Sequence, residues 1–251
     1  MASVGTQAWR APEVVHTSAS SMLRTAKSDC FSMGLVFFFV LSKGTHPYSK
    51  SPTDISATIE ANINNPKFVI KKLASPIQQH LVAGLLRHDP SERLTSAQVV
   101  NHPLFMTNSD KLGFLKVFKK MRKKKVCFSD ERKNQTCFDQ FPELLRAGAP
   151  YAWIKKVPPS IASSSLRSSK LTSPYAETLY DACRFVRNLH EHAVNDKDEV
   201  ARELQKLLKI PNTPTRSQLA IFVTKTFPEL AAFAFDAVKS AVEGKVRANG
   251  A

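Results

Sequence analysis

The sequence predicts an all-α protein, and three observations support this prediction. Apolar residues recur every three or four positions through most of the long segments, which is the period of an amphipathic helix. Two pairs, Ser75-Pro76 and Ser173-Pro174, have the form of a helix N-cap followed by proline at the first helical position. Alternation of apolar and polar residues never lasts more than a few positions, so no β-strand pattern competes with the helices.

The first expected helices lie in residues 1–125. Residues 27–41 place apolar residues on every side of a helix and contain four phenylalanines, which predicts a helix buried in the middle of a domain. A helix is expected to follow Ser75-Pro76, and a short one to begin at Thr95 and stop at Pro103. Residues 108–125 repeat the helical period and end in the basic run 119–125, which we interpret as a solvated helix end.

The remaining residues are expected to be helix and loop. Residues 160–173 are rich in serine and have no usable period, which predicts a mobile loop. A helix is expected from Pro174 to about His192, followed by helices over residues 198–208 and 214–243. The last of these should be broken at Phe227-Pro228, because proline removes a helix hydrogen bond.

The net charge points to a polyanionic partner for the second part of the chain. Lys and Arg number 36 against 21 Asp and Glu, a formal charge of +15. Residues 1–107 hold 10 basic and 6 acidic side chains (10 − 6 = +4), which leaves 26 and 15 (26 − 15 = +11) for residues 108–251. Such an excess attracts nucleic acid over long range, although a basic surface that only keeps the protein soluble is the common alternative.

Cysteine spacing and hydropathy exclude several classes of function. Four cysteines stand far apart with no C-x-x-C pair, so we expect no metal site and a reduced, cytosolic setting. The longest apolar run, residues 33–41, is far shorter than the roughly 20 residues that a membrane-spanning helix needs. No secretory signal is apparent, and this segment is expected to make no membrane contact.

The helix expected from Pro174 sorts into two faces. An apolar face should pack inward, and it comprises Ala182, Val186, Leu189 and Ala193. The other face carries four polar residues, Asp181, Arg184, Asn188 and His192. Cleavage of RNA by its own 2′-hydroxyl needs a base, an acid and groups that hold the phosphate, and histidine suits the proton transfers. Arg187 or Arg184 could hold the phosphate, but by pattern alone such a face is more often only solvated.

Residues 5–13, GTQAWRAPE, resemble the end of a protein-kinase activation segment, with the A-P-E triplet at 11–13. Residues 28–34, 88–94 and 101–105 resemble later segments of the kinase C-lobe in the same order. The resemblance implies a truncated C-lobe over residues 1–107. It also implies a structural ion pair between Glu13 and Arg93, and an Asp29 that holds the backbone of the catalytic loop.

Several kinase motifs have no counterpart in this sequence. It has no glycine-rich nucleotide loop, strand lysine, H-R-D or D-F-G, which phosphoryl transfer requires. We therefore expect no kinase activity from this chain, no cofactor in it, and ATP or ADP with Mg²⁺ only in parts of the lobe that it lacks. Two interpretations stay open: a piece of a longer Ser/Thr kinase, or a complete protein in which residues 1–107 are a scaffold.

Residues 185–192, FVRNLHEH, resemble the nuclease signature of the kinase-extension endoribonuclease family. That family comprises ribonuclease L and the inositol-requiring transmembrane kinase/endoribonuclease of the unfolded protein response. The resemblance implies a helical kinase-extension nuclease domain over residues 108–247. Matched residue by residue, His192 is the catalytic histidine, and Arg187 and Asn188 are the family's arginine and asparagine. Asp181 matches an active-site aspartate of ribonuclease L. Tyr175 lies where that enzyme also has a tyrosine, and it could act in acid/base chemistry or stack on a base.

Other positions have less definite roles. We expect Arg184, Lys155 and Lys156 to contact RNA. Trp153 matches a family tryptophan, which could belong to the core or to the site. Leu189 agrees with the ribonuclease L branch and differs from the lysine of the transmembrane branch, so the branch stays open. His190 has no counterpart in the pattern, and we interpret it as incidental.

The resemblance thus implies a metal-independent endoribonuclease that leaves a 2′,3′-cyclic phosphate. Its expected partners are RNA and a second copy of the chain, paired through the kinase-extension domain. A cytosolic location is expected, at the cytosolic face of the endoplasmic reticulum if a longer parent is a transmembrane sensor. The alternatives are a catalytically silent dimerisation or regulatory module of a dual kinase-ribonuclease, and a basic RNA-binding module.

Overall fold

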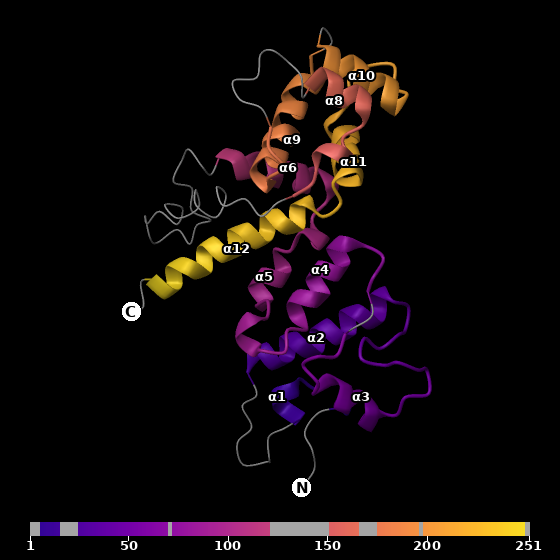
Figure 1. Ribbon diagram of the computed structural model, residues 1–251, viewed down its shortest axis with the longest axis vertical. Coiled ribbons are helices and arrows are strands. Elements are labelled where there is room, and N and C mark those ends of the chain that lie inside the picture. The colour runs from indigo at the N-terminus through magenta and orange to yellow at the C-terminus, as the bar shows by residue number, and fades with distance from the viewer. Residues whose placement is uncertain are drawn as a thin grey trace. The chain divides into compact units, whose positions relative to one another are not determined.

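A computed structural model describes residues 6–15, 25–69, 72–120, 151–165, 175–195 and 198–248, with the backbone alone at 118–120 and 240–248. The chain divides into two compact units, residues 1–105 and 106–251. Every regular element in the described residues is a helix (Figure 1), as the sequence predicts. None of these helices combines the length and the apolar character that crossing a membrane requires.

Seven helices make up the described part of the first unit. They are α1 (Pro12–Val15), α2 (Ala26–Leu41), α3 (Ser56–Ile63), α4 (Pro76–Leu85), η1 (Pro90–Glu92), α5 (Ser96–Val100) and η2 (Pro103–Phe105). Ser75 occupies the N-cap of α4 as expected, although its side chain makes no capping hydrogen bond. Thr95 does cap α5, since its hydroxyl accepts a hydrogen bond from the Gln98 backbone in a capping box.

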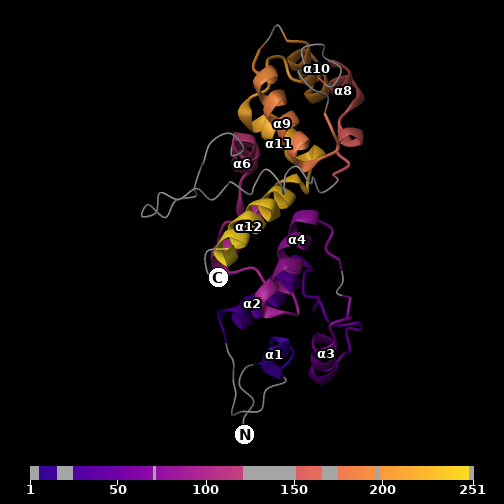
Figure 2. The same cartoon turned by 60° about the vertical axis from the view of Figure 1, so that its left-hand side comes forward.

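The core of the first unit forms where α2 crosses α4, which lie side by side in both ribbon views (Figures 1 and 2). Phe31, Leu35 and Phe38 of α2 are at most 1% exposed. Gly34 allows the close approach, because a Cβ atom there would lie 2.8 Å from the Cβ of Leu85. The crossing therefore tolerates no larger residue at position 34 without a shift of the helices.

Burial of α2 on every side, as the sequence predicts, is wrong. Val36 is 50% exposed and Val40 is 66% exposed, because α4 and its neighbours cover only one face of the helix. An apolar sequence sets the free energy available from burial, but the elements that pack around it decide how much is realised.

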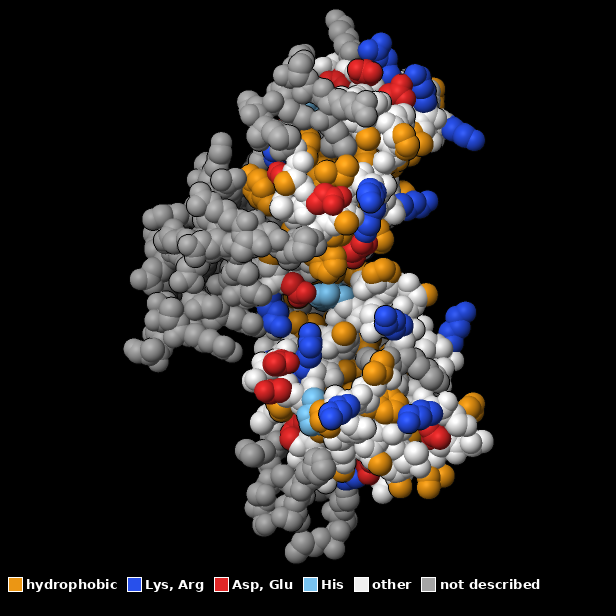
Figure 3. Space-filling view, viewed as in Figure 1, with side chains coloured by type: hydrophobic (Ala, Val, Ile, Leu, Met, Phe, Trp, Pro, Cys, Tyr) orange, Lys and Arg blue, Asp and Glu red, His pale blue; other side chains and the backbone are white. Residues whose placement is uncertain are grey.

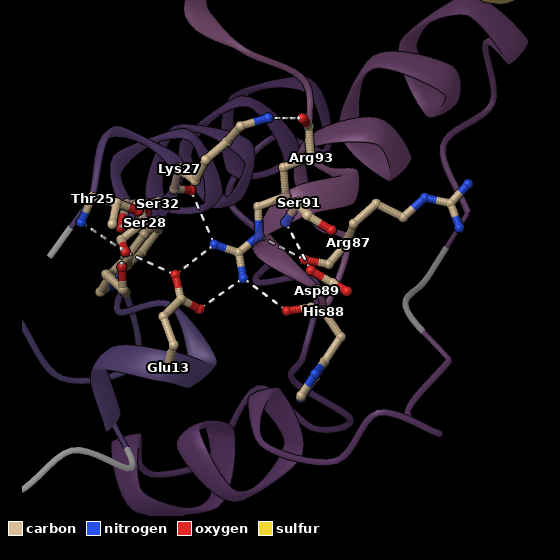
Figure 4. Close-up of polar contacts among 11 residues, drawn as sticks. Glu13, Thr25, Lys27, Ser28, Ser32, Arg87, His88, Asp89, Ser91 and Arg93 are labelled. Carbon is tan, nitrogen blue, oxygen red and sulfur yellow. Dashed lines mark hydrogen bonds and ion pairs between the residues drawn. The ribbon is translucent and has the colours of Figure 1, made fainter. Parts of the chain in front are cut away.

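A buried arginine joins three segments of the first unit (Figure 4). The Arg93 side chain is 0% exposed, and its two terminal nitrogens donate to the two carboxylate oxygens of Glu13 at 2.7 and 2.8 Å. It also donates to the backbone carbonyls of Arg87, Lys27 and His88 at 2.7, 3.0 and 2.9 Å. The guanidinium thus holds α1, the start of α2 and the segment before η1 together.

Asp29 is an exposed residue of α2. The role that the kinase resemblance implies for it, holding a catalytic loop, involves sequence that this chain does not contain, so it stays a prediction.

The second unit is built around the contacts of α6 with α9 and α11 (Figure 1). Its described elements are α6 (Asn108–Lys120), η3 (Ile154–Lys156), α8 (Pro159–Ser165), α9 (Leu179–Ala193), α10 (Glu199–Leu208), α11 (Arg216–Thr226) and α12 (Leu230–Ala248). The break expected at Phe227-Pro228 is confirmed, because α11 ends at Thr226 and α12 begins at Leu230. Trp153, Phe185 and Val186 are at most 1% exposed in the core of the unit.

Two predictions for the second unit are wrong in part. The serine-rich segment is helical to Ser165, since Ile161 is fully buried and Ser163 donates to the Ser160 carbonyl at 2.8 Å, within the helix. The helix expected from Pro174 begins instead at Leu179, because the Thr178 hydroxyl accepts from the Asp181 backbone at 3.1 Å and caps it.

Some predictions fall on residues outside the described ones. These are residues 166–173 of the serine-rich segment, Pro174, and the side chains of the basic run 119–125. The helix that was expected to reach residue 125 is described as far as Lys120.

Candidate active site

A short segment before α9 brings Tyr175 to the helix. The Ala176 backbone N–H donates to the Asp181 carboxylate at 2.8 Å, and the Ala176 carbonyl accepts from the Trp153 indole at 2.9 Å. The Tyr151 backbone N–H donates to the Glu177 carbonyl at 3.0 Å. Three hydrogen bonds therefore hold residues 175–178 against α9 and the segment around Trp153.

Asp181, which the sequence places on the polar face of α9, is buried. Asp181 is only 8% exposed, because residues 175–178 cover the part of α9 where it lies. The Arg184 side chain is 12% exposed, with its Nη1 atom 3.4 Å from Asp181 and its guanidinium carbon 4.7 Å from the centre of the Tyr175 ring. Both side chains support Tyr175. The expected contact of Arg184 with RNA stays a prediction.

A chain of hydrogen bonds links Arg187, Asn188 and Tyr175. The Arg187 Nε and Nη2 atoms donate to the Asn188 side-chain oxygen at 3.1 and 2.6 Å. The Asn188 amide nitrogen donates to the Tyr175 hydroxyl oxygen at 2.7 Å. Arginine has no acceptor, so the amide oxygen must face Arg187 and the amide nitrogen must face Tyr175. The Tyr175 oxygen therefore accepts from Asn188, and its own O–H is left to donate elsewhere.

The environment of Tyr175 keeps its phenol neutral. Burial raises the pKa of Tyr175, and the hydrogen bond from Asn188 and the charge of Arg184 only partly oppose this shift. The ring meets Trp153 edge to face, with 5.6 Å between ring centres. Tyr175 is therefore positioned as a proton donor at neutral pH rather than as a base.

His192 lies one turn beyond Asn188 on α9 and is much more open. Its side chain is 53% exposed, and its Nδ1 atom lies 2.7 Å from a carboxylate oxygen of Asp198, the N-cap residue of α10. The other Asp198 oxygen accepts from the Val200 backbone at 2.9 Å. Sequence reasoning missed Asp198, although its place just before a helix marks it as a cap.

His190, two residues before His192, has different surroundings. Its ring nitrogens lie 3.1 and 3.2 Å from the Lys116 ammonium of α6. Burial lowers the pKa of His190, and the charges of Lys116 and Arg216 lower it further. The ring is therefore neutral near pH 7 and can accept an N–H of Lys116. It has neither the exposure nor the carboxylate partner of His192.

The two lysines expected to contact RNA lie on η3. Lys156 is paired with Glu229, which precedes α12, and its ammonium lies 4.9 Å from the centre of the Tyr151 ring. Lys155 is exposed. On the face drawn in Figure 3, the described Lys and Arg side chains are interspersed with Asp, Glu and apolar groups over both units. That face carries no continuous basic patch among the described side chains.

The described part of α9 and its neighbours therefore presents four kinds of group: an open imidazole, a neutral phenol, an amide and a guanidinium. Among the residues that the structure describes, no three His, Cys, Asp or Glu side chains gather as metal ligands would. These are the kinds of group that can act as base, acid and phosphate ligand in phosphodiester transfer.

Comparison with known proteins supports the kinase resemblance of the first unit. Residues 1–105 match the family model of the protein kinase domain. Tribbles homolog 2 of Mus musculus is 33% identical over 105 residues, which cover 41% of this chain and 29% of that protein. Serine/threonine-protein kinase/endoribonuclease ire-1 of Caenorhabditis elegans is 36% identical over 114 residues, which cover 44% of this chain and 11% of that protein.

Weaker similarity extends into the second unit. Serine/threonine-protein kinase/endoribonuclease IRE1a of Arabidopsis thaliana is 24% identical over 213 residues, which cover 81% of this chain and 22% of that protein. The chain thus spans between 11% and 29% of the length of these relatives. Its first unit is similar to the protein kinase domain, and the chain is similar in part to serine/threonine-protein kinase/endoribonucleases.

Proposed function

We propose that the second unit is an endoribonuclease that cuts RNA without a metal ion, by attack of the RNA 2′-hydroxyl on the adjacent phosphate. The observation that carries this proposal is the bonded chain Arg187–Asn188–Tyr175, one helical turn from the open imidazole of His192. The relatives named kinase/endoribonucleases agree with it, although they are much longer than this chain.

Each proton in the proposed reaction has a donor and an acceptor. His192 takes the proton of the 2′-hydroxyl as its oxygen bonds to phosphorus. The bond from phosphorus to the 5′-oxygen breaks, and Tyr175 donates its proton to that oxygen. The products are a 2′,3′-cyclic phosphate and a 5′-hydroxyl. The Tyr175 phenolate then regains a proton and His192 loses one, so the site is restored by way of solvent.

Arg187 is the proposed phosphate ligand. Its side chain is 27% exposed, and it already donates to Asn188 while lying 3.6 Å from Glu191. A guanidinium has five N–H donors, so these contacts leave it donors for phosphate oxygens. Asn188 connects the proposed phosphate ligand with the proposed acid, because its side-chain amide orients both the Arg187 guanidinium and the Tyr175 phenol.

The proposed partners are RNA and a second copy of this chain, with the reaction taking place in the cytosol. Nucleotide and Mg²⁺ would act only in a longer protein that contains the remaining parts of a kinase lobe. If pairing of two chains is required, activity should rise more steeply than linearly with protein concentration.

The test is cleavage of a stem-loop RNA by the full chain at micromolar concentration, with and without EDTA. We expect cleavage that EDTA does not reduce and that His192→Ala lowers by about 100-fold or more. His190→Ala is the matched control, since it removes an imidazole from the same helix and should leave the rate within about 3-fold. Product ends should be a cyclic phosphate and a 5′-hydroxyl.

Two results would contradict the proposal. Binding of the RNA without cutting would favour a silent dimerisation module. Cleavage could also be equal in His192→Ala and wild type and disappear together with binding as salt is added. That result would favour a basic RNA-binding module, with the cutting due to a contaminating nuclease in the preparation.

A further inference from the structure

We infer that Asp198 is a positioning residue that holds His192 in one tautomer, with the proton on Nδ1 and the lone pair on Nε2. The inference rests on the proposed function for its catalytic consequence, but the tautomer itself is a property of the folded chain. No part of the sequence resemblance pointed to Asp198.

The two carboxylate oxygens of Asp198 do different things. One oxygen accepts from the Val200 backbone N–H at 2.9 Å and so caps α10. The other lies 2.7 Å from Nδ1 of His192. A cap needs only one oxygen, as the hydroxyl of Thr215 demonstrates at the start of α11. The contact with His192 is therefore additional to the needs of the helix.

Two backbone hydrogen bonds near the ends of α9 and α10 keep this contact in place. The His192 carbonyl accepts from the Asn195 backbone at 3.2 Å, and the Asn195 carbonyl accepts from the Asp198 backbone at 2.8 Å. Ala193 and Val200, which flank the pair, are at most 3% exposed and fix the ends of the two helices. These bonds place the backbone of Asp198 beside His192, and the bond from Val200 restrains its carboxylate.

The chemistry of the contact selects the tautomer. An ionised carboxylate has no proton to donate, so the hydrogen between the two groups must belong to Nδ1. In the neutral ring the lone pair is then on Nε2, which points away from Asp198. That nitrogen is the one able to accept a proton from a 2′-hydroxyl, and the carboxylate stabilises the imidazolium that results.

Three substitutions in the full chain separate the two oxygens. Asp198→Asn keeps one side-chain oxygen. When that oxygen caps α10, the amide NH₂ group faces Nδ1 of His192, and Nδ1 must then accept a hydrogen bond instead of donating one. Asp198→Ser keeps a capping hydroxyl but has no group that reaches the imidazole. Asp198→Ala loses both contacts and is the control for loss of the cap.

The first readout is the ¹⁵N NMR spectrum of the His192 ring at alkaline pH, assigned by its loss in His192→Ala. In the wild type we expect a protonated Nδ1 and an unprotonated Nε2. Asp198→Asn and Asp198→Ser should shift the ring toward the opposite tautomer. Their thermal midpoints should stay above that of Asp198→Ala, because both retain a cap.

The second readout is cleavage of the stem-loop RNA. We expect Asp198→Asn and Asp198→Ser to lower the rate by about 10- to 100-fold, less than in a fully buried triad because the imidazole is 53% exposed. An unchanged tautomer and an unchanged rate in both variants would overturn the inference. A wild-type chain that cuts no RNA would contradict the proposed function, while the tautomer shift would still support the positioning role of Asp198.

Discussion

Replacing Glu13 with alanine should destabilise the first unit strongly, because it removes the carboxylate that is hydrogen-bonded to the buried guanidinium of Arg93 (Figure 4). The Arg93 side chain is 0% exposed, and two of its five hydrogen bonds go to Glu13. The other three go to backbone carbonyls, which satisfy N–H groups but supply no full negative charge. Alanine therefore removes the charge compensation while the fold still holds the cation.

The expected loss is about 3 kcal/mol in the free energy of unfolding. Breaking a fully buried ion pair costs roughly 3–5 kcal/mol. The lower end applies here, because the Glu13 side chain is 22% exposed and water can replace part of what it provides. Arg93→Met should cost as much or more, since it removes a hydrogen-bond donor from three carbonyls, and each buried acceptor left unsatisfied costs about 1–3 kcal/mol.

Fluorine NMR can read the two units separately. The chain has two tryptophans, Trp9 in the first unit and Trp153 in the second, so 5-fluorotryptophan labelling should give one resonance for each. Urea titration would then follow each unit in the same sample. Glu13→Ala should move the Trp9 transition to lower urea and leave the Trp153 transition in place.

The control is Glu203→Ala, which breaks an exposed ion pair with Lys206 on α10. The Lys206 side chain is 72% exposed, so the loss should stay below about 1 kcal/mol. If Glu13→Ala cost no more than this control, the argument that Arg93 depends on its counter-ion would be refuted.

Three further predictions concern other residues. Tyr175→Phe should keep the packing against Trp153 but lower the rate of RNA cleavage by about 100-fold under single-turnover conditions. An unchanged rate would exclude the phenol as the acid. Burial lowers the pKa of His46 against an opposing hydrogen bond to Ala8, so the folded state binds the proton less readily than the unfolded state. The stability of the first unit should therefore fall as the pH drops below the ordinary value of 6.5, and this dependence should vanish in His46→Gln but persist in His88→Gln. Trp153→Phe loses the hydrogen bond to the Ala176 carbonyl and should lower the free energy of unfolding of the second unit by about 1–3 kcal/mol. Amide exchange in residues 175–178 should be faster than in the wild type, and should increase more there than in the rest of the second unit. An equal increase everywhere would show that the indole does not hold this segment.

Periodicity predicted the inward face of α9 correctly. Ala182, Val186, Leu189 and Ala193 are all at most 1% exposed, as their spacing of three and four residues requires. The break between α11 and α12 was equally visible, because proline acts within its own helical turn. Features of this kind depend on neighbours only a few residues away, and the sequence contains those neighbours.

Polar residues on α9 were harder to place. Asp181, Asn188 and His192 share one side of the helix by spacing, yet Asp181 is covered and His192 is open. The difference comes from residues 175–178, which fold over the beginning of the helix and leave its end uncovered. Helical periodicity gives the direction of a side chain, but it carries no information on what another segment places in front of it.

By itself, the sequence determined most of the longer helices, the inward face of α9, and the types of chemical group available at the candidate site. Only the tertiary structure decided that Asp198 meets His192, that Asp181 supports Tyr175 from inside, and that Val36 and Val40 stay exposed. The physical reason is that helix formation and amphipathicity are properties of contiguous residues. Burial and hydrogen bonding of a side chain depend instead on segments that approach it through the turns and loops, and local periodicity does not encode those approaches.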